Sequence, residues 1–285
     1  MTTRSVLLTG ASTGIGRATA RYLAERQLRV FAGVRRDADA ASLREEKLEG
    51  LVPLRLDVTR ADEIEDARAR IERELRASGE PGLAGVVNNA GRATPAVQEF
   101  LEVDEFRDQI EVNLIGVVAV NRAFLALVRA GRGRIVNIGS LGGYNAAPFL
   151  GPYAASKFAL EGLSDSLRRE LRPFGLQVSL IEPGSVATPI WEKSIAYGDG
   201  LRQRMPAEAR PLYAPLLEKI EAYARSAARR GIPPERVARA IHHALTSPRP
   251  RTRYRVGLDA KLLRVLTRVL PDRAMDAIVS RFVGI

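Results

Sequence analysis

A tyrosine and a lysine stand four positions apart in the stretch PYAASKFALEGLSDSLRREL, residues 152–171. Apolar residues recur through it with a period of about 3.6 residues, which predicts a helix carrying Tyr153 and Lys157 on one face. A phenol with a pKa of ~10 is a poor acid or base at neutral pH, but a nearby ammonium favours the phenolate and lowers that pKa. The pair is therefore a candidate acid/base and its activator. On these two residues alone, a surface tyrosine beside a helix-stabilising lysine is the commoner arrangement.

Short apolar runs alternate with helical patterns along the chain, and they indicate how such a pair would be positioned. The runs expected as strands are 5–10, 29–34, 51–58, 83–91, 133–140 and 176–184. The helical patterns cover about 16–26, 38–48, 61–77, 104–130 and 152–171. Continuously apolar strands that alternate with helices are typical of a parallel sheet covered on both faces. The sequence therefore predicts an α/β fold, a Rossmann-like doubly wound parallel sheet flanked by helices, as one domain over residues 1–285.

Glycine-rich and polar segments follow the expected strands, where ligands bind in doubly wound sheets. The first is TGASTGIG, residues 9–16, a strand-to-helix turn. Its glycines allow close approach to the backbone, and the N-terminus of the following helix attracts a pyrophosphate. The spacing Gly10-x3-Gly14-x-Gly16 differs from the common G-x-G-x-x-G fingerprint. By itself, this segment is explained about as well by an ordinary tight turn.

The composition excludes several kinds of site. The chain has no cysteine, and its two histidines, His242 and His243, point in different directions on an expected helix, so we expect no catalytic metal. The net charge is +11, but the basic residues are scattered and mostly arginine, so we expect a solvated basic surface and no nucleic-acid partner. The chain shows no signal-peptide pattern and no uncharged run near the ~20 residues that span a bilayer. We therefore expect a cytoplasmic protein.

Taken together and in order, the segments TGASTGIG, NNAG, VNLIG and S…YxxxK closely resemble the short-chain dehydrogenase/reductase family, over roughly residues 5–190. The resemblance implies a catalytic set of Asn113, Ser140, Tyr153 and Lys157. It implies that hydride passes between a nicotinamide and a carbonyl carbon, while Tyr153 donates a proton to the carbonyl oxygen and Ser140 hydrogen-bonds that oxygen. Lys157 would also bind the nicotinamide ribose, and Asn113 would hold a water that connects Lys157 to solvent.

The same resemblance implies how a nicotinamide dinucleotide is bound. The backbone after Pro183-Gly184 and the Thr188 hydroxyl would hold the carboxamide, and the segment at 89–91 would lie beside the adenosine ribose. The candidate cofactor-binding residues are Gly10, Ser12, Thr13, Gly14, Ile15, Gly16, Arg35, Arg36, Asp57, Val58, Asn89, Ala90, Gly91, Tyr153, Lys157, Pro183, Gly184, Val186 and Thr188.

The residues after the second strand bear on the choice of cofactor. An enzyme selective for NAD commonly places a carboxylate at the end of that strand, where it bonds the ribose hydroxyls and repels a 2′-phosphate. Here that position is Val34, and it is followed by Arg35 and Arg36, whose guanidinium groups can bind a phosphate. We therefore expect NADP(H) to be preferred over NAD(H). The alternative is that the two arginines are simply solvated.

The segments SKFALEGL and PFG resemble the branch of the family that contains estradiol 17β-dehydrogenase type 1 and the retinol dehydrogenases. That resemblance implies a hydroxyl or carbonyl on a bulky hydrophobic substrate, steroid-like or retinoid-like. The candidate substrate-binding residues are Ser140, Gly142, Tyr144, Phe149, Tyr153 and Trp191. Residues 190–230 are either a lid over the substrate or an ordinary helical insert. A 3-oxoacyl thioester reductase and a dinucleotide-sensing scaffold without activity stay open as alternatives.

Two segments bear on larger partners. The C-terminal extension, residues 258–285, is amphipathic and basic, which is compatible with contact to a membrane surface, although packing on its own domain or on a second subunit is commoner. The expected helices 104–130 and 152–171 are rich in apolar residues. In the family that this chain resembles, these helices commonly pair two subunits, so we expect a homodimer or a homotetramer.

Overall fold

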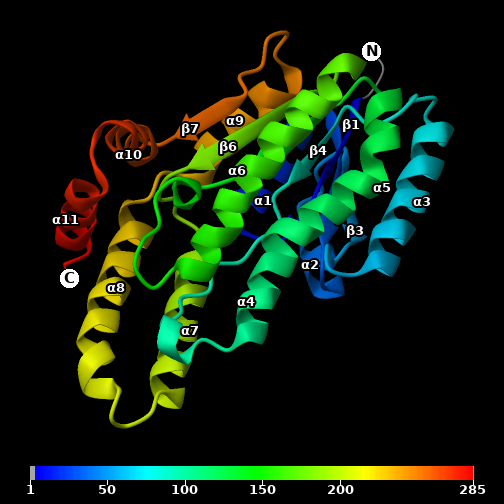
Figure 1. Ribbon diagram of the computed structural model, residues 1–285. Coiled ribbons are helices and arrows are strands. Elements are labelled where there is room, and N and C mark those ends of the chain that lie inside the picture. Colours follow the sequence, from blue (N-terminus) through cyan, green and yellow to red (C-terminus); the bar gives the residue numbers. More distant parts are fainter. Residues whose placement is uncertain (1–3, 285) are drawn as a thin grey trace.

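A parallel sheet forms the centre of the computed structural model, which describes residues 4–284 (Figure 1). In this part of the chain the sheet has seven strands in the order β3-β2-β1-β4-β5-β6-β7, and all neighbouring strands are parallel. The strands are β1 Arg4–Leu8, β2 Leu28–Val34, β3 Leu51–Arg55, β4 Gly85–Asn88, β5 Arg134–Ile138, β6 Gln177–Pro183 and β7 Arg253–Val256. The order reverses between β1 and β4, which is the position where doubly wound sheets bind ligands. The predicted fold is confirmed.

Helices cover both faces of the sheet (Figure 1). They are α1 Gly14–Ala24, α2 Asp37–Arg44, α3 Ala61–Ala77, α4 Val103–Ile110, α5 Gly116–Ala130, α6 Gly151–Leu171, α7 Ile190–Arg204, α8 Arg210–Arg230, α9 Pro234–Thr246, α10 Leu258–Val269 and α11 Asp272–Val283. Successive side chains of a strand point to opposite faces, so Val6 and Leu8 pack in one apolar cluster with α1, α2 and α9, while Leu7 packs in the other with α3 and α5. Burial on both faces explains why the strands read as continuous apolar runs.

The edge strand β7 is the strand that the sequence analysis missed. It reads RYRV, and it lacks the continuous apolar run that marks the other strands. Its two arginines are accommodated because Glu182 of β6, which is fully buried, forms ion pairs with Arg253 at 3.1 Å and with Arg255 at 2.9 Å. This contact joins strands that are far apart in sequence, and nothing in the local pattern of residues 253–256 predicts it.

The predicted helix over 104–130 is one helical rod with a local change of geometry. A π-helical turn, Glu111–Ile115, separates α4 from α5 and contains Asn113. Such turns occur often at functional sites. By length and hydropathy alone, Val103–Ala130 is long and apolar enough to cross a membrane. Its α5 part packs Val120 and Phe124 against the sheet, while Val118 of the same helix is exposed.

The segment at 190–230 forms two helices, α7 and α8, that lie side by side and extend beyond the sheet (Figure 1). A separate apolar cluster joins this helical hairpin to the body of the protein. It contains Val97, Phe100, Phe149, Leu201, Met205, Ala209, Tyr213 and Leu217. The hairpin is thus attached through Phe149, which lies in the loop that follows β5 and precedes α6.

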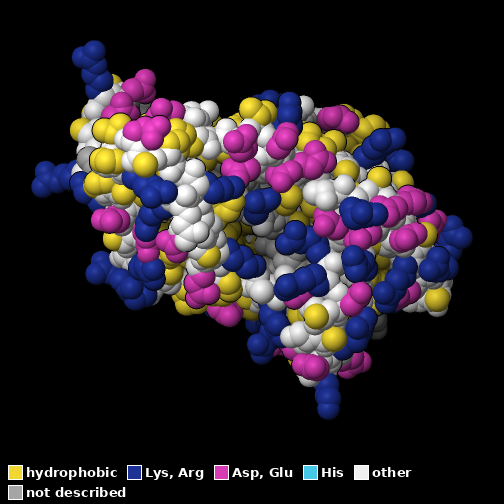
Figure 2. Space-filling view, turned by 90° about the horizontal axis from the view of Figure 1, so that it is seen from below, with side chains coloured by type: hydrophobic (Ala, Val, Ile, Leu, Met, Phe, Trp, Pro, Cys, Tyr) yellow, Lys and Arg dark blue, Asp and Glu magenta, His cyan; other side chains and the backbone are white. Residues whose placement is uncertain are grey.

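Charged side chains are mixed over the surface. Figure 2, a view from below the orientation of Figure 1, shows Lys and Arg side chains interspersed with Asp and Glu, and they do not gather in one basic block on this face. Many arginines are paired within the fold, for example Arg204 with Glu105 at 2.8 Å and Arg29 with Glu80 at 2.8 Å. Pairing of this kind neutralises these arginines locally, while the full chain has a net charge of +11.

Candidate active site

The glycine-rich turn between β1 and α1 presents bare backbone at the carboxyl edge of the sheet. Gly10 and Gly14 have φ values of +66° and +54°, a region that side chains rarely adopt. A Cβ on Gly16 would lie 2.0 Å from the Gly10 carbonyl oxygen, so only glycine fits there. The N-terminus of α1 follows directly, and its free amides suit a pyrophosphate. The residues present therefore fit a nicotinamide dinucleotide.

The NNAG segment after β4 supports this turn from the side. Asn89 Nδ2 donates to the carbonyl oxygens of Thr9 and Gly10 at 3.0 and 2.9 Å. Thr9 Oγ1 accepts hydrogen bonds from the backbone amides of Asn89 and Ala90, both at 3.0 Å. Thr9 was not among the predicted site residues, although it begins the TGASTGIG segment. Thr9 is buried between the glycine-rich turn and the segment at 89–91, so its hydrogen bonds stabilise that turn.

A second buried polar group joins the strands beneath the site. Asn88 Nδ2 donates to Asn121 Oδ1 at 2.9 Å and to Asn137 Oδ1 at 2.8 Å. Asn137 Nδ2 in turn donates to Ser164 Oγ at 2.9 Å. These bonds tie β4 and β5 to α5 and α6, and so they fix the helix that carries the candidate acid/base. Sequence reasoning missed this group because its members come from four elements.

The predicted catalytic set comes together at the carboxyl end of β5. Ser140 follows β5, and Tyr153 lies at the start of α6. Both side chains lie close to Gly142, where a Cβ would be 3.4 Å from Ser140 Oγ. The Lys157 Nζ lies 5.8 Å from the centre of the Tyr153 ring and donates to the Ile138 carbonyl oxygen at 2.8 Å. Gly142 lies against the Tyr153 ring, because a Cβ there would be 3.0 Å from its Cε1 atom.

The pKa shifts of Tyr153 and Lys157 differ from the expectation based on sequence. Burial raises the pKa of Tyr153, and the Ser140 side chain opposes that shift only in part. Burial also lowers the pKa of Lys157 to about 8. The expected lowering of the Tyr153 pKa by the lysine is therefore wrong for the protein alone, because burial is the largest influence on that pKa and raises it. A protonated phenol is suited to donate a proton to a developing alkoxide.

Asn113 lies next to this set but its side chain bonds to protein groups. Its Nδ2 donates to Ser156 Oγ and to the Arg92 carbonyl oxygen, both at 3.0 Å, and its Oδ1 accepts from the Arg92 amide at 2.9 Å. Gln109 also bonds the Arg92 carbonyl oxygen, at 2.6 Å. Asn113 and Gln109 thus anchor the segment after Gly91, a structural role that the sequence analysis did not predict. The water expected at Asn113 stays a prediction.

The loop after β6 approaches the cofactor turn. A Cβ on Gly14 would lie 3.1 Å from the Cβ of Thr188, so the two loops are in contact. Trp191, at the start of α7, donates from Nε1 to the Val186 carbonyl oxygen at 2.8 Å, and its ring packs edge-on against Tyr223 of α8. The loop that carries Pro183 and Gly184 is therefore joined to the hairpin of α7 and α8 through Trp191.

The remaining substrate-binding candidates contribute apolar surface. The Tyr144 hydroxyl donates to the Ala260 carbonyl oxygen at 2.7 Å, and the Arg264 guanidinium lies 5.0 Å from the centre of its ring. Burial raises the pKa of the Tyr144 hydroxyl. Phe149 belongs to the cluster of the hairpin. The polar atoms of Tyr144 and Trp191 are thus bound to backbone, and contact of these residues with a substrate stays a prediction.

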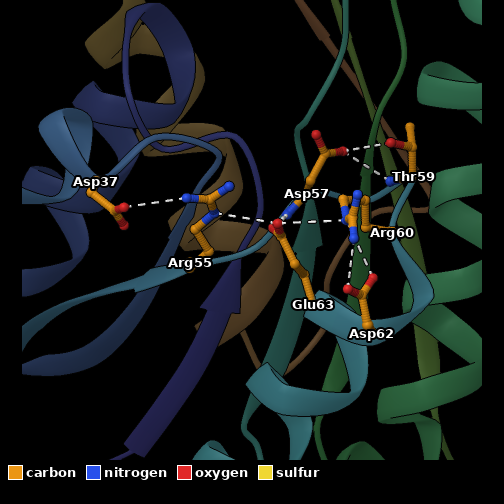
Figure 3. A network of polar contacts seen from close by, with 7 residues as sticks. All are labelled: Asp37, Arg55, Asp57, Thr59, Arg60, Asp62 and Glu63. Carbon is orange, nitrogen blue, oxygen red and sulfur yellow. Dashed lines mark hydrogen bonds and ion pairs between the residues drawn. The ribbon is translucent and has the colours of Figure 1, made fainter.

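The loops after β2 and β3 place the arginines and acids that bear on the adenosine end. Arg36 pairs with Asp39 at 2.8 Å, while Arg35 is exposed and has no ion pair among the described residues. Figure 3 shows the neighbouring network, in which Arg55 holds the Asp37 carboxylate at 3.2 Å. The Asp57 carboxylate turns back to Thr59 Oγ1 at 2.8 Å (Figure 3). Both nearby aspartates are thus occupied within the protein.

No group of three or more His, Cys, Asp or Glu side chains arranged to hold a metal ion occurs within residues 4–284. A glycine-rich turn at the switch point, with serine, tyrosine and lysine at the carboxyl edge, is the arrangement of an oxidoreductase that uses a nicotinamide dinucleotide.

Comparisons with known proteins agree with that class. A model of the short chain dehydrogenase family matches residues 4–197. Human retinol dehydrogenase 16 is 37% identical over 282 residues, with 96% of this chain and 87% of that protein covered. Bovine 17-beta-hydroxysteroid dehydrogenase type 6 is 36% identical over 284 residues, with 97% and 87% covered. A solved short-chain dehydrogenase from Streptomyces avermitilis matches 100% of this chain and 96% of its own, with a TM-score of 0.75 and 26% identity.

The chain belongs to the short chain dehydrogenase family, and within it to the branch of retinol and steroid dehydrogenases. It is an NAD(P)-dependent oxidoreductase.

Proposed function

We propose that the protein interconverts a hydroxyl and a carbonyl on a bulky hydrophobic substrate, steroid-like or retinoid-like, with NADP(H) as cofactor. The observation that carries this proposal is that Ser140 and Tyr153 both lie against Gly142, within a site whose neighbouring hairpin supplies an apolar cluster through Phe149. The names of the relatives, a retinol dehydrogenase and a hydroxysteroid dehydrogenase, support the same substrate class.

The residues of this site have distinct roles in the reaction proposed. When bound, the reduced nicotinamide would supply a hydride to the carbonyl carbon. The Tyr153 phenol donates its proton to the carbonyl oxygen, and the Ser140 hydroxyl donates a hydrogen bond that stabilises the charge on that oxygen. Lys157, held by the Ile138 carbonyl oxygen at 2.8 Å, lies where it can bind the ribose and restore the phenolic proton. Oxidation uses the same atoms in reverse.

A screen of substrates tests the proposal. Absorbance of the reduced cofactor is followed with steroids, retinoids, acyl thioesters and simple ketones, and the Tyr153→Phe variant serves as the control for each active compound. We expect the highest kcat/KM among steroids or retinoids. If an acetoacetyl thioester is turned over faster than any of them, the protein is a 3-oxoacyl thioester reductase instead.

We predict that Arg35 decides the choice of cofactor, because the Arg36 guanidinium already bonds both Asp39 oxygens at 2.8 and 2.9 Å. A guanidinium bond to a 2′-phosphate is worth about ten- to a hundredfold in affinity. NADP(H) should therefore exceed NAD(H) by at least about tenfold in kcat/KM, and Arg35→Ala should remove most of that preference through the KM for NADP(H).

Arg36→Ala is the matched comparison for this prediction. It should change the ratio less than Arg35→Ala, since its guanidinium is bound to Asp39. A wild-type preference for NAD(H), or an unchanged ratio in the Arg35 variant, would contradict the assignment of this loop.

Assembly as a homodimer, or a tetramer of dimers, is part of the proposal. Val118 of α5, Phe158 of α6 and Ile115 of the π turn are 42%, 47% and 44% exposed, and such apolar side chains favour burial against a second subunit. Light scattering at micromolar concentration should give at least twice the chain mass of 31.2 kDa. Phe158→Asp should shift the mass toward the monomer, whereas Phe174→Asp, on another exposed surface, should not. A wild-type mass near 31.2 kDa would refute this assembly.

Contact with a membrane surface is the secondary proposal for the C-terminal extension. Leu258, Leu262, Val265 and Val269 recur along one side of α10 and are 83%, 62%, 58% and 73% exposed. Basic residues of the same helix flank them, which is the pattern of helices that lie on anionic bilayers. Flotation with anionic vesicles at physiological salt tests it, and protein that stays below the vesicles rules it out. The cytoplasmic location also stays a prediction.

A further inference from the structure

The Asp259 carboxylate, in the first turn of α10, lies against the loop after β6. The Ser185 amide donates to its Oδ2 at 2.6 Å, across 74 positions of sequence. Its Oδ1 accepts from the Ala260 amide at 2.9 Å. Hydrogen bonds to a charged acceptor are shorter and stronger than those between neutral groups. Asp259 is thus the side chain that fixes the backbone between Gly184 and Val186.

Two glycines leave the space that this carboxylate occupies. A Cβ on Gly184 would lie 1.9 Å from the Asp259 Oδ1, and a Cβ on Gly257 would lie 2.4 Å from the same atom. Gly257 also has a φ of +114°, which other residues rarely adopt. The local backbone on both sides is therefore compatible with the carboxylate only because neither position carries a side chain.

Other backbone contacts of the same loop also come from beyond the segment that matches the family model, residues 4–197. The Gly184 amide donates to the Val256 carbonyl oxygen at 2.9 Å. The Ile232 amide donates to the Ser185 carbonyl oxygen at 2.9 Å. The Tyr144 hydroxyl, in the segment after Ser140, is bound to Ala260 next to Asp259. The first turn of α10 therefore contacts both loops that border the candidate nicotinamide pocket.

We propose that Asp259 is a positioning residue, which holds the Ser185 backbone in the conformation that receives the nicotinamide. The C-terminal extension would then complete the cofactor site. This inference rests on the proposed placement of the nicotinamide against Pro183–Thr188.

The test separates the contribution of the nicotinamide to binding affinity from the contribution of the rest of the cofactor. Calorimetry measures the Kd of the intact dinucleotide and of the matching ADP-ribose, which lacks only the nicotinamide, for wild type and Asp259→Asn. An asparagine has one acceptor oxygen for the two amides that the carboxylate serves, so one hydrogen bond is lost. We expect the intact dinucleotide to bind about tenfold more weakly, and ADP-ribose to bind with unchanged affinity.

The controls decide between a local and a general effect. Asp276→Asn, an exposed aspartate of α11, should change neither Kd. Equal weakening of both ligands by Asp259→Asn, or no weakening of either, overturns the role of Asp259. If wild type binds the dinucleotide no more tightly than ADP-ribose, the proposed placement of the nicotinamide fails as well.

Amide hydrogen exchange tests the proposal on the wild-type protein alone, without a measurement of activity and without a variant. In the wild-type protein the Ser185 amide should exchange much more slowly than in a free peptide, since it is bonded to Asp259 at 2.6 Å. Exchange at the rate of a free peptide would overturn the proposal.

Discussion

Replacing Tyr153 with phenylalanine is expected to lower turnover by ~10²-fold or more, with the affinity for cofactor nearly unchanged. The variant keeps the ring that packs on Gly142 and removes only the phenolic hydroxyl. Burial raises the pKa of that hydroxyl, so at neutral pH the protein alone holds the proton that carbonyl reduction consumes. Phenylalanine leaves the developing alkoxide without its donor.

Steady-state kinetics and cofactor titration of purified protein measure both quantities. Tyr22→Phe, a tyrosine of α1 whose ring contacts Arg26, is the control and should retain full turnover. Near-normal turnover of the Tyr153 variant would remove this residue from the reaction. A large loss of cofactor affinity with intact turnover would make it a binding residue only.

Lys157→Met is expected to have opposite effects on activity and stability. Burial lowers the pKa of Lys157 from its ordinary value of 10.5 to about 8. The folded state therefore binds this proton less tightly than the unfolded chain, and a shift of this size is worth about 3 kcal/mol. Below pH 8 the lysine is charged in both states, so the full cost of burying the charge opposes folding. That cost is relieved as pH rises from about 8 to 10.5.

Methionine fills a similar volume without a charge, although it leaves the Ile138 carbonyl oxygen without its partner. We expect the variant to be more stable than wild type by about 1–2 kcal/mol at pH 7, and the difference to shrink toward pH 10. Turnover should fall by ~10²-fold or more, because the lysine is proposed to restore the phenolic proton and to bind the ribose.

Thermal unfolding of the cofactor-free protein at several pH values measures the stability difference. Lys219→Met, an exposed lysine of α8, should show no such dependence on pH. If the wild-type protein is more stable than Lys157→Met at pH 7, the buried ammonium is stabilised by its surroundings. Full activity of the variant would exclude Lys157 from the reaction.

The sequence by itself determined the strands β1 to β6 and the residues that follow them at one edge of the sheet. Continuous apolar runs specify strands that are buried on both faces, and the residues that follow them must meet at one edge because parallel strands end there. Local pattern therefore predicted that the turn at 9–16 follows a strand and that Tyr153 and Lys157 share one face of a helix, whereas their membership of one catalytic site was predicted from the family resemblance of the motifs taken together.

The tertiary structure decided how those residues behave. The direction of the pKa shift of Tyr153 depends on desolvation, which cannot be predicted from the local sequence pattern. Which arginine is left for a phosphate depends on the bond from Arg36 to Asp39. The strand β7 is stabilised by an ion pair with Glu182, and the loop at Ser185 is held by Asp259 across 74 positions of chain. Each of these depends on a distance between side chains that only the folded chain establishes, because residues far apart in sequence approach one another only after the sheet has formed.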